Sequence, residues 1–204
     1  MPNSDGVAGP FVGVHQGALI VAGGANFPAG VPWHATAGGG KSLKTYHQAI
    51  HILTNDDQGP RWQTVAATLP RPLGYGVSIE TPHGVVCIGG EWQEHRLPDD
   101  SIVDSLLTGG EGSAETTSTT HRSDAVFVIR WDAGKQKVEV SDQWHLPEEN
   151  PVGIRPMPEL PAATTSAVGG MIGDYLYLAS GDHGEGGSAQ YWRLDLRKRF
   201  KDAD

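Results

Sequence analysis

Short apolar runs that end in glycine recur along the chain. Residues 18–24 (ALIVAGG) and 84–90 (GVVCIGG) share a run of strand-forming residues closed by a Gly pair, and residues 175–181 (YLYLASG) repeat it more loosely. Runs of five or six such residues bounded by glycine are typical of buried strands rather than helices. The three copies therefore indicate an internal repeat built around a buried strand.

Further apolar segments accompany each copy in the same order. A short run precedes each copy, at residues 11–14, 76–79 and 165–168. A run of alternating aromatic and aliphatic residues follows each copy, at residues 46–53, 124–131 and 189–196. In the first two units a Trp then precedes a Leu-Pro pair, namely Trp62 with Leu69-Pro70 and Trp144 with Leu146-Pro147. We therefore predict a four-stranded unit whose fourth strand carries the Trp, and a loop over the Gly/Ser/Thr-rich residues 105–120.

This order of strands resembles the kelch repeat, in which each unit is one blade of a β-propeller. A load of 28 Gly and 14 Pro in 204 residues also disfavours helices. The predicted fold is an all-β kelch-type propeller, with a single domain over residues 1–204. Blade one is expected at residues 9–70, blade two at 74–147 and a partial blade three at 163–196. Since propellers have four to eight blades, we expect the chain to represent an incomplete propeller.

Charge and composition exclude several classes of function. The formal net charge is −9, which is wrong for a nucleic-acid partner, and no apolar run is long enough for a membrane helix. The single cysteine, Cys87, lies within a strand-like run, so neither a disulfide nor a multi-cysteine metal site is expected. Residues 1–5 lack the features of a signal peptide. The compartment stays open, as cytoplasmic, or periplasmic or extracellular after removal of a signal.

Several longer strings resemble one branch of the kelch proteins, the sialic acid mutarotases or N-acetylneuraminate epimerases, and in particular its cyclically permuted members. These strings are DGVAG at residues 5–9, AGGANFP at 22–28, GYGVS at 74–78, IGGE at 88–91 and RSDAVF at 122–127. The resemblance covers residues 5–196. It implies an isomerase that acts on N-acetylneuraminate or a related sugar by acid/base catalysis, without a cofactor or a metal.

The same resemblance implies where the catalytic groups lie. In family order, the blade with the acidic residue proposed as catalytic would fall after residue 204, and its counterpart by repeat position within this chain is Glu91. Mutarotation opens and recloses a cyclic sugar, which needs a base at the anomeric hydroxyl and an acid at the ring oxygen. Glu91 is the expected base, and Arg122 is the expected anchor of the sugar carboxylate.

Glu91 is expected at the axial mouth of the propeller, where the Gly-Gly ends of the inner strands lie. Four other residues are expected to bind substrate at this mouth: Asn26, Phe27, Arg71 and Tyr75. Plainer roles stay open for the two catalytic candidates. Glu91 could be a solvated loop carboxylate, and Arg122 could form an ion pair with Asp124 or Glu91. For the whole chain, the alternatives to an enzyme are a kelch module that binds a protein or glycan, and an inactive truncated copy. Unpaired blade edges would also favour self-association.

Overall fold

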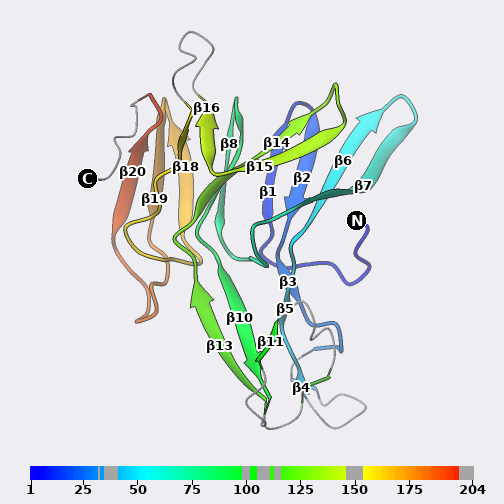
Figure 1. Cartoon of the computed structure of the whole chain (residues 1–204), viewed down its shortest axis with the longest axis vertical. Helices are drawn as coiled ribbons and strands as arrows, with labels where there is room; N and C mark the ends of the chain where they lie inside the picture. Colours follow the sequence, from blue (N-terminus) through cyan, green and yellow to red (C-terminus); the bar gives the residue numbers. More distant parts are fainter. Residues whose placement is uncertain are drawn as a thin grey trace.

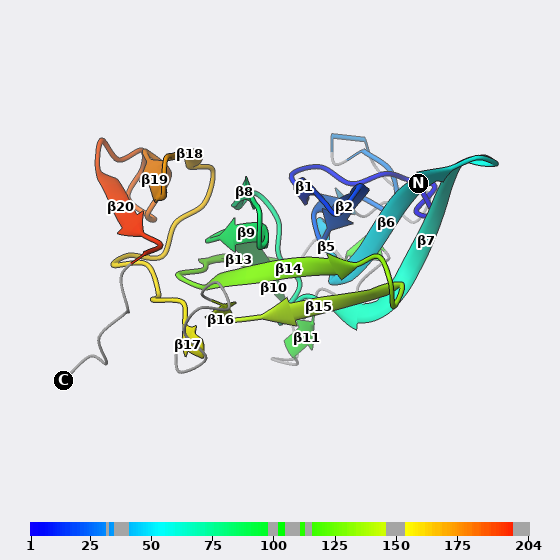
Figure 2. The same ribbon diagram turned by 90° about the horizontal axis from the view of Figure 1, so that it is seen from above.

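Three antiparallel sheets of three or four strands stand side by side (Figure 1). The computed structural model describes residues 1–31, 33–34, 41–97, 102–104, 111–112, 116–145 and 154–197, and all regular elements within these residues are strands. Seen from above, the sheets follow one another like adjacent blades (Figure 2). The fold is a partial kelch-type β-propeller.

Blade one has the strand order β1-β2-β6-β7. Its strands are β1 (Phe11–His15), β2 (Ala18–Ala22), β6 (Ala49–Asp56) and β7 (Gly59–Thr68). Trp62 lies in β7, opposite Leu53 of β6, as predicted for the fourth strand. Alternate residues of β1 are buried, because one face of the blade packs against blade two while the other lies open.

Blade two has the same architecture, with the order β8-β9-β14-β15 from one edge to the other. Its strands are β8 (Val77–Thr81), β9 (Gly84–Ile88), β14 (Val126–Asp132) and β15 (Lys137–Ser141). The prediction that Trp144 marks the fourth strand was wrong. Trp144 lies in β16 (Gln143–His145), which pairs with β17 (Ile154–Pro156), while the short KVEVS segment forms the outer strand.

Blade three has three described strands, in the order β18-β19-β20. They are β18 (Val168–Ile172), β19 (Tyr175–Ala179) and β20 (Tyr191–Asp195). The predicted opening run at residues 165–168 overlaps β18 only at Val168, because Thr165 forms an isolated bridge with Asp182 instead of joining the strand. Residues 198–204 lie outside the described part of the chain.

Two hydrophobic cores lie between the blades rather than within any one of them. Between blades one and two, Phe11, Ile20 and Ile52 pack with Phe127 and Trp131. Between blades two and three, the core combines residues of both blades with the Trp144 side chain: Val77, Ile79, Val86, Ile88, Val126, Val128, Trp144, Met157, Leu176, Leu178 and Leu196. Each blade is therefore stabilised mainly by its neighbour.

The Gly pairs bring neighbouring blades into backbone contact. The second glycine of each pair donates its N–H to the next blade, Gly24 to the Leu73 carbonyl at 2.7 Å and Gly90 to the Thr164 carbonyl at 2.8 Å. The first glycine has a positive φ in both pairs, +67° at Gly23 and +66° at Gly89. A Cβ at Gly23 would lie 2.3 Å from the Leu73 oxygen, so no side chain fits at this joint.

The connections that leave the Gly pairs extend beyond the blades, toward the lower end of Figure 1. In blade one, β3 (Ala25–Asn26) pairs with β5 (Thr45–Tyr46). In blade two, β10 (Glu91–Arg96) pairs with both β13 (Thr117–Arg122) and β11 (Ile102–Asp104). A short pair of β4 (Lys41–Ser42) with β12 (Glu111–Gly112) joins the two extensions. The prediction of a loop over residues 105–120 was therefore wrong for β12 and for residues 117–120; residues 105–110 and 113–115 lie outside the described part.

Candidate functional site

Glu91 directly follows the second Gly pair, Gly89-Gly90. It is the first residue of β10, and its backbone is fixed to the entry of blade two by hydrogen bonds in both directions with Gly74. Its Oε1 atom accepts a hydrogen bond from the Tyr46 hydroxyl at 2.5 Å and lies 3.3 Å from the Lys44 ammonium. The Glu91 side chain is only 15% exposed, so its carboxylate is held mainly by side chains of blade one.

Lys44 is enclosed by aromatic rings as well as by the carboxylate. Its Nζ atom lies 4.1 Å from the centre of the Tyr75 ring and 5.0 Å from that of Tyr46, and the two rings meet edge to face. The negative faces of aromatic rings attract an ammonium group, and more strongly where water is scarce. Four side chains therefore form one compact cluster: Lys44, Tyr46, Tyr75 and Glu91.

Tyr46 acts in this cluster as a fixed hydrogen-bond donor. Its side chain is fully buried, and its pKa is raised strongly by burial and further by the hydrogen bond and negative charge of Glu91. Both causes penalise the phenolate. Tyr46 therefore keeps its proton and donates a hydrogen bond to the carboxylate.

The Tyr75 ring owes its place to an unusual backbone conformation. Tyr75 has a φ of +59°, which an aromatic residue adopts only when its surroundings hold it there. Its N–H donates to the Gly9 carbonyl at 2.7 Å, and its carbonyl accepts from the N–H of Ser166 at 2.8 Å. A Cβ on Gly9 would lie 2.6 Å from the Tyr75 ring, so glycine is needed there for the ring to reach Lys44.

Arg122 lies directly opposite Glu91 in the β10–β13 ladder but faces blade three. Its guanidinium pairs with Asp182 at 2.8 Å, in place of the pairing with Asp124 or Glu91 that was considered from the sequence. This hydrogen bond is the main cause that lowers the pKa of Asp182. The Nε atom of Arg122 is buried and has no hydrogen-bond partner among the described residues. Arg122 therefore has donor capacity left for an anion.

The other predicted substrate ligands have partners within the protein. Asn26 donates to the Gly6 carbonyl and its amide oxygen meets His47 Nε2, both at 2.9 Å. Phe27 is half-buried and closes a turn with Gly30. Arg71 is exposed and stacks over the Trp92 ring at 4.2 Å. The structure thus brings Tyr75 to Glu91 through Lys44, while Phe27 and Arg71 make their contacts elsewhere.

Two members of the Glu91 cluster were missed by sequence reasoning, and so was Asp182. Lys44 and Tyr46 lie 47 and 45 residues from Glu91 in the sequence, and they reach it only because β5 lies beside β10. The signal that the sequence offers for these contacts is the opposite charge of the partner residues. Lys44 pairs with Glu91 and Arg122 pairs with Asp182, and the two ion pairs are neighbours because Glu91 and Arg122 lie opposite each other in the β10–β13 ladder.

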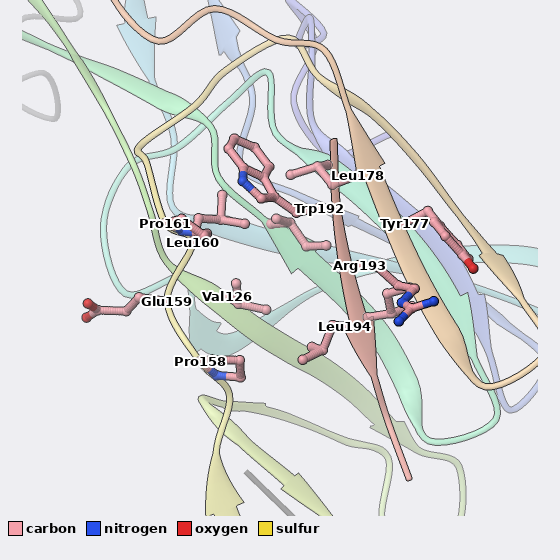
Figure 3. A pocket seen from close by; sticks show the side chains of 12 residues that line it. Val126, Pro158, Glu159, Leu160, Pro161, Tyr177, Leu178, Trp192, Arg193 and Leu194 are labelled. Atoms are coloured by element: carbon pink, nitrogen blue, oxygen red, sulfur yellow. The ribbon is translucent and has the colours of Figure 1, made fainter. Parts of the chain in front are cut away.

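A separate pocket lies between blades two and three, and its chemistry differs. It has a volume of about 240 Å³ and an apolar lining, which Figure 3 shows around Val126, Leu178 and Trp192. In Figure 3 the carboxylate of Glu159 points away from these side chains. The lining of this pocket is thus mainly apolar, whereas the Glu91 cluster places a carboxylate beside an ammonium group.

Among the described residues, no group of three or more His, Cys, Asp or Glu side chains is placed to hold a metal ion. No helix in this part of the chain is long and apolar enough to cross a membrane.

Comparison with known proteins places the chain in a family. A family model described as N-acetylneuraminate epimerase matches residues 2–112, more than half of the chain. The chain belongs to the N-acetylneuraminate epimerase family. It is 36% identical over 141 residues to the N-acetylneuraminate epimerase of Yersinia pestis (strain Pestoides F), which covers 66% of this chain and 28% of that relative. It is 39% identical over 95 residues to the enzyme of that name from Pasteurella multocida (strain Pm70), covering 43% of this chain and 23% of the relative.

Membership of the N-acetylneuraminate epimerase family agrees with the fold. The solved structure of YjhT superimposes with a TM-score of 0.56 at 14% identity, and the match covers 92% of this chain and 42% of YjhT. The resemblance predicted from the five strings is therefore confirmed at the level of family and fold. The chain spans less than a third of the length of the epimerase relatives it matches.

Proposed function

We propose that the chain contributes an acid/base site that interconverts the anomers of N-acetylneuraminate or a closely related acidic sugar. The observation that carries the proposal is the Glu91 carboxylate, held by an ammonium group and a hydroxyl at the Gly-Gly end of blade two. Family membership supplies the substrate class, since the matched relatives are named for N-acetylneuraminate.

The residues have distinct roles in this proposal. Glu91 takes the proton of the anomeric hydroxyl while the bond from the anomeric carbon to the ring oxygen breaks. The electron pair of that bond goes to the ring oxygen, which takes a proton from the Lys44 ammonium, and the open-chain ketone results. Reclosure on the other face of the carbonyl returns both protons and gives the second anomer. Tyr46 remains protonated throughout and holds the carboxylate in place.

Arg122 is the proposed anchor for the sugar carboxylate. A guanidinium binds a carboxylate through two parallel hydrogen bonds, and the Nε atom of Arg122 has no partner among the described residues. Asp182 occupies one terminal nitrogen, so substrate binding would displace or share this contact. Asn26, Phe27, Arg71 and Tyr75 are the further proposed substrate-binding residues, and Tyr75 is the one of them that contacts the Glu91 cluster through Lys44.

The experiment is NMR exchange spectroscopy of N-acetylneuraminate anomers with and without the full chain. The chain should accelerate anomer exchange, and Glu91→Gln should abolish the acceleration while circular dichroism stays unchanged. Glu80→Gln is the matched control, because Glu80 lies in the same blade but accepts a hydrogen bond from Val14 of blade one. Saturable sugar binding without faster exchange would reject the enzyme and favour a sugar-binding module.

We also propose that the chain is one domain over residues 1–204, with blades at 9–70, 74–147 and 163–196. The two inter-blade cores support this arrangement, because neither outer blade could be separated without exposing one of them. Scanning calorimetry should then show a single transition. Two transitions would mean that the blades unfold independently.

We also propose that the chain self-associates through its outer blades. Blade three exposes Val168, Ile172 and Tyr191 on the side away from blade two, and blade one exposes Val12 and Val14 on its own far side. Unpartnered apolar faces of this kind favour contact with a second copy. Analytical ultracentrifugation should show a mass that rises with concentration, and Ile172→Lys should reduce it. A monomer at every concentration would refute this part.

A further inference from the structure

Two polar contacts of a single buried side chain connect the β10–β13 ladder to the segment that carries Lys44. His95 lies in β10 and is completely buried. Its Nδ1 atom lies 2.7 Å from the Ser118 hydroxyl in β13, and its Nε2 atom lies 3.1 Å from the main-chain carbonyl oxygen of Lys44. Ser118 belongs to β13, whereas Lys44 directly precedes β5, so His95 joins the extensions of blades one and two.

The chemistry of the partners fixes the proton on His95. A carbonyl oxygen can only accept a hydrogen bond, so Nε2 carries a hydrogen and donates it to Lys44. The Ser118 hydroxyl can either donate to Nδ1 or accept from it, so both ring nitrogens have a hydrogen-bond partner. The backbone of Lys44 is thereby tied to β10 through one directed hydrogen bond.

The position of this contact determines where the Lys44 side chain ends. Glu91 and His95 are four residues apart on β10, so both point to the same face and stand about 13 Å apart along the strand. Lys44 is held at its backbone by His95, and its ammonium reaches 3.3 Å from Glu91. We propose that His95 is a positioning residue that sets the Lys44 ammonium against Glu91 and Tyr75. Its effect on catalysis rests on the function proposed above, whereas the positioning itself does not.

Two amide substitutions distinguish the contact of His95 with Lys44 from its contact with Ser118. The amide nitrogen of Gln can take the place of Nε2, so His95→Gln should keep the bond to Lys44. Asn is shorter by one carbon, so His95→Asn should keep the contact with Ser118 and lose the one with Lys44. Both variants place an amide in the same buried site, which makes them a matched pair.

The first measurement is the rate at which acetic anhydride modifies each lysine, followed by peptide mass spectrometry. Lys44 is 20% exposed and Lys135 is 79% exposed, so Lys135 serves as the internal reference. In His95→Asn the Lys44 rate should rise severalfold relative to Lys135, and in His95→Gln it should stay at the wild-type ratio. An unchanged Lys44 rate in folded His95→Asn overturns the proposal. Equal loss of fold in both variants also overturns it, because His95 would then be purely structural.

The second measurement is anomer exchange of N-acetylneuraminate. His95→Asn should lower kcat by up to about a hundredfold with little change in KM, because a displaced ammonium no longer meets the ring oxygen. His95→Gln should restore most of the rate. Absence of exchange in every variant, with the lysine modification rates as expected, would reject the proposed function and leave the positioning role intact.

Discussion

Substituting the first glycine of a Gly pair tests how neighbouring blades are joined. Gly23→Ala places a methyl group 2.3 Å from the Leu73 oxygen and 2.6 Å from a Leu69 methyl carbon, at a φ of +67°. Gly17→Ala is the matched control, because Gly17 has a φ of +74° but nothing within 4 Å of the new Cβ. Both substitutions restrict the unfolded chain equally, so the difference between them reports the contact at the joint.

The magnitudes follow from three contributions. An alanine in the left-handed region costs about 1 kcal/mol, and this cost is common to both variants. Overpacking at Gly23 adds about 1–3 kcal/mol. The Leu73 carbonyl also accepts the Gly24 N–H, and its displacement weakens a hydrogen bond worth about 1 kcal/mol. Gly23→Ala should therefore lower the free energy of unfolding by about 2–4 kcal/mol more than Gly17→Ala does.

Equilibrium unfolding in urea, monitored by tryptophan fluorescence, measures this difference. The dependence of free energy on urea concentration should be the same in wild type and both variants, which shows that only stability has changed. Equal losses of stability in the two variants would refute the reasoning, because the joint would then tolerate a side chain and the Gly pair would serve backbone conformation alone.

Three further predictions concern charge and protonation. Burial and Glu91 raise the pKa of Tyr46 above 10. Stability should therefore fall as the pH rises past about 10, because only the unfolded chain releases the Tyr46 proton there. In urea unfolding, Tyr46→Phe should flatten this decline. Burial lowers the pKa of His47 below 6.5. Stability should therefore fall as the pH drops through 6.5, because the unfolded chain binds the proton first. His47→Gln should make stability depend less on pH in this range. Asp182→Asn should free the Arg122 guanidinium and tighten N-acetylneuraminate binding severalfold in calorimetric titration; unchanged affinity would remove Arg122 as the anchor.

The blades could be predicted from the sequence because their strands obey a local rule. Each buried strand is a short apolar run with glycine at its end, and the rule needs no knowledge of distant residues. The fourth strand of blade two escaped because KVEVS has only two apolar residues, while the more conspicuous Trp144 lies in the next connection. A large aromatic side chain identifies burial, and here that burial is in the core between blades two and three.

The candidate site could be predicted only in part, for a different physical reason. Glu91 followed from its position after a Gly pair, but its partners are set by the contact between two extensions. The strands β10 and β13 read EWQEHR and TSTTHR, which lack the apolar alternation that marks a half-buried strand. They are held by the ladder between them and by buried polar contacts such as that of His95. Contacts of this kind leave no periodic pattern in the sequence.

The looser match of the third copy of the repeat has a structural explanation at the position that corresponds to Gly23 and Gly89. Ser180 stands where blades one and two have the first glycine, and it adopts the same left-handed conformation with a φ of +63°. At Gly23 and Gly89 a Cβ would lie 2.3 and 2.5 Å from a carbonyl oxygen of the following blade, whereas Ser180 is exposed among the described residues. The conformation alone therefore tolerates serine, and glycine is required only where a neighbouring backbone arrives. A blade or second copy that joined blade three in the manner of the other two joints would meet the Ser180 side chain, so Ser180→Gly should strengthen any association through this face.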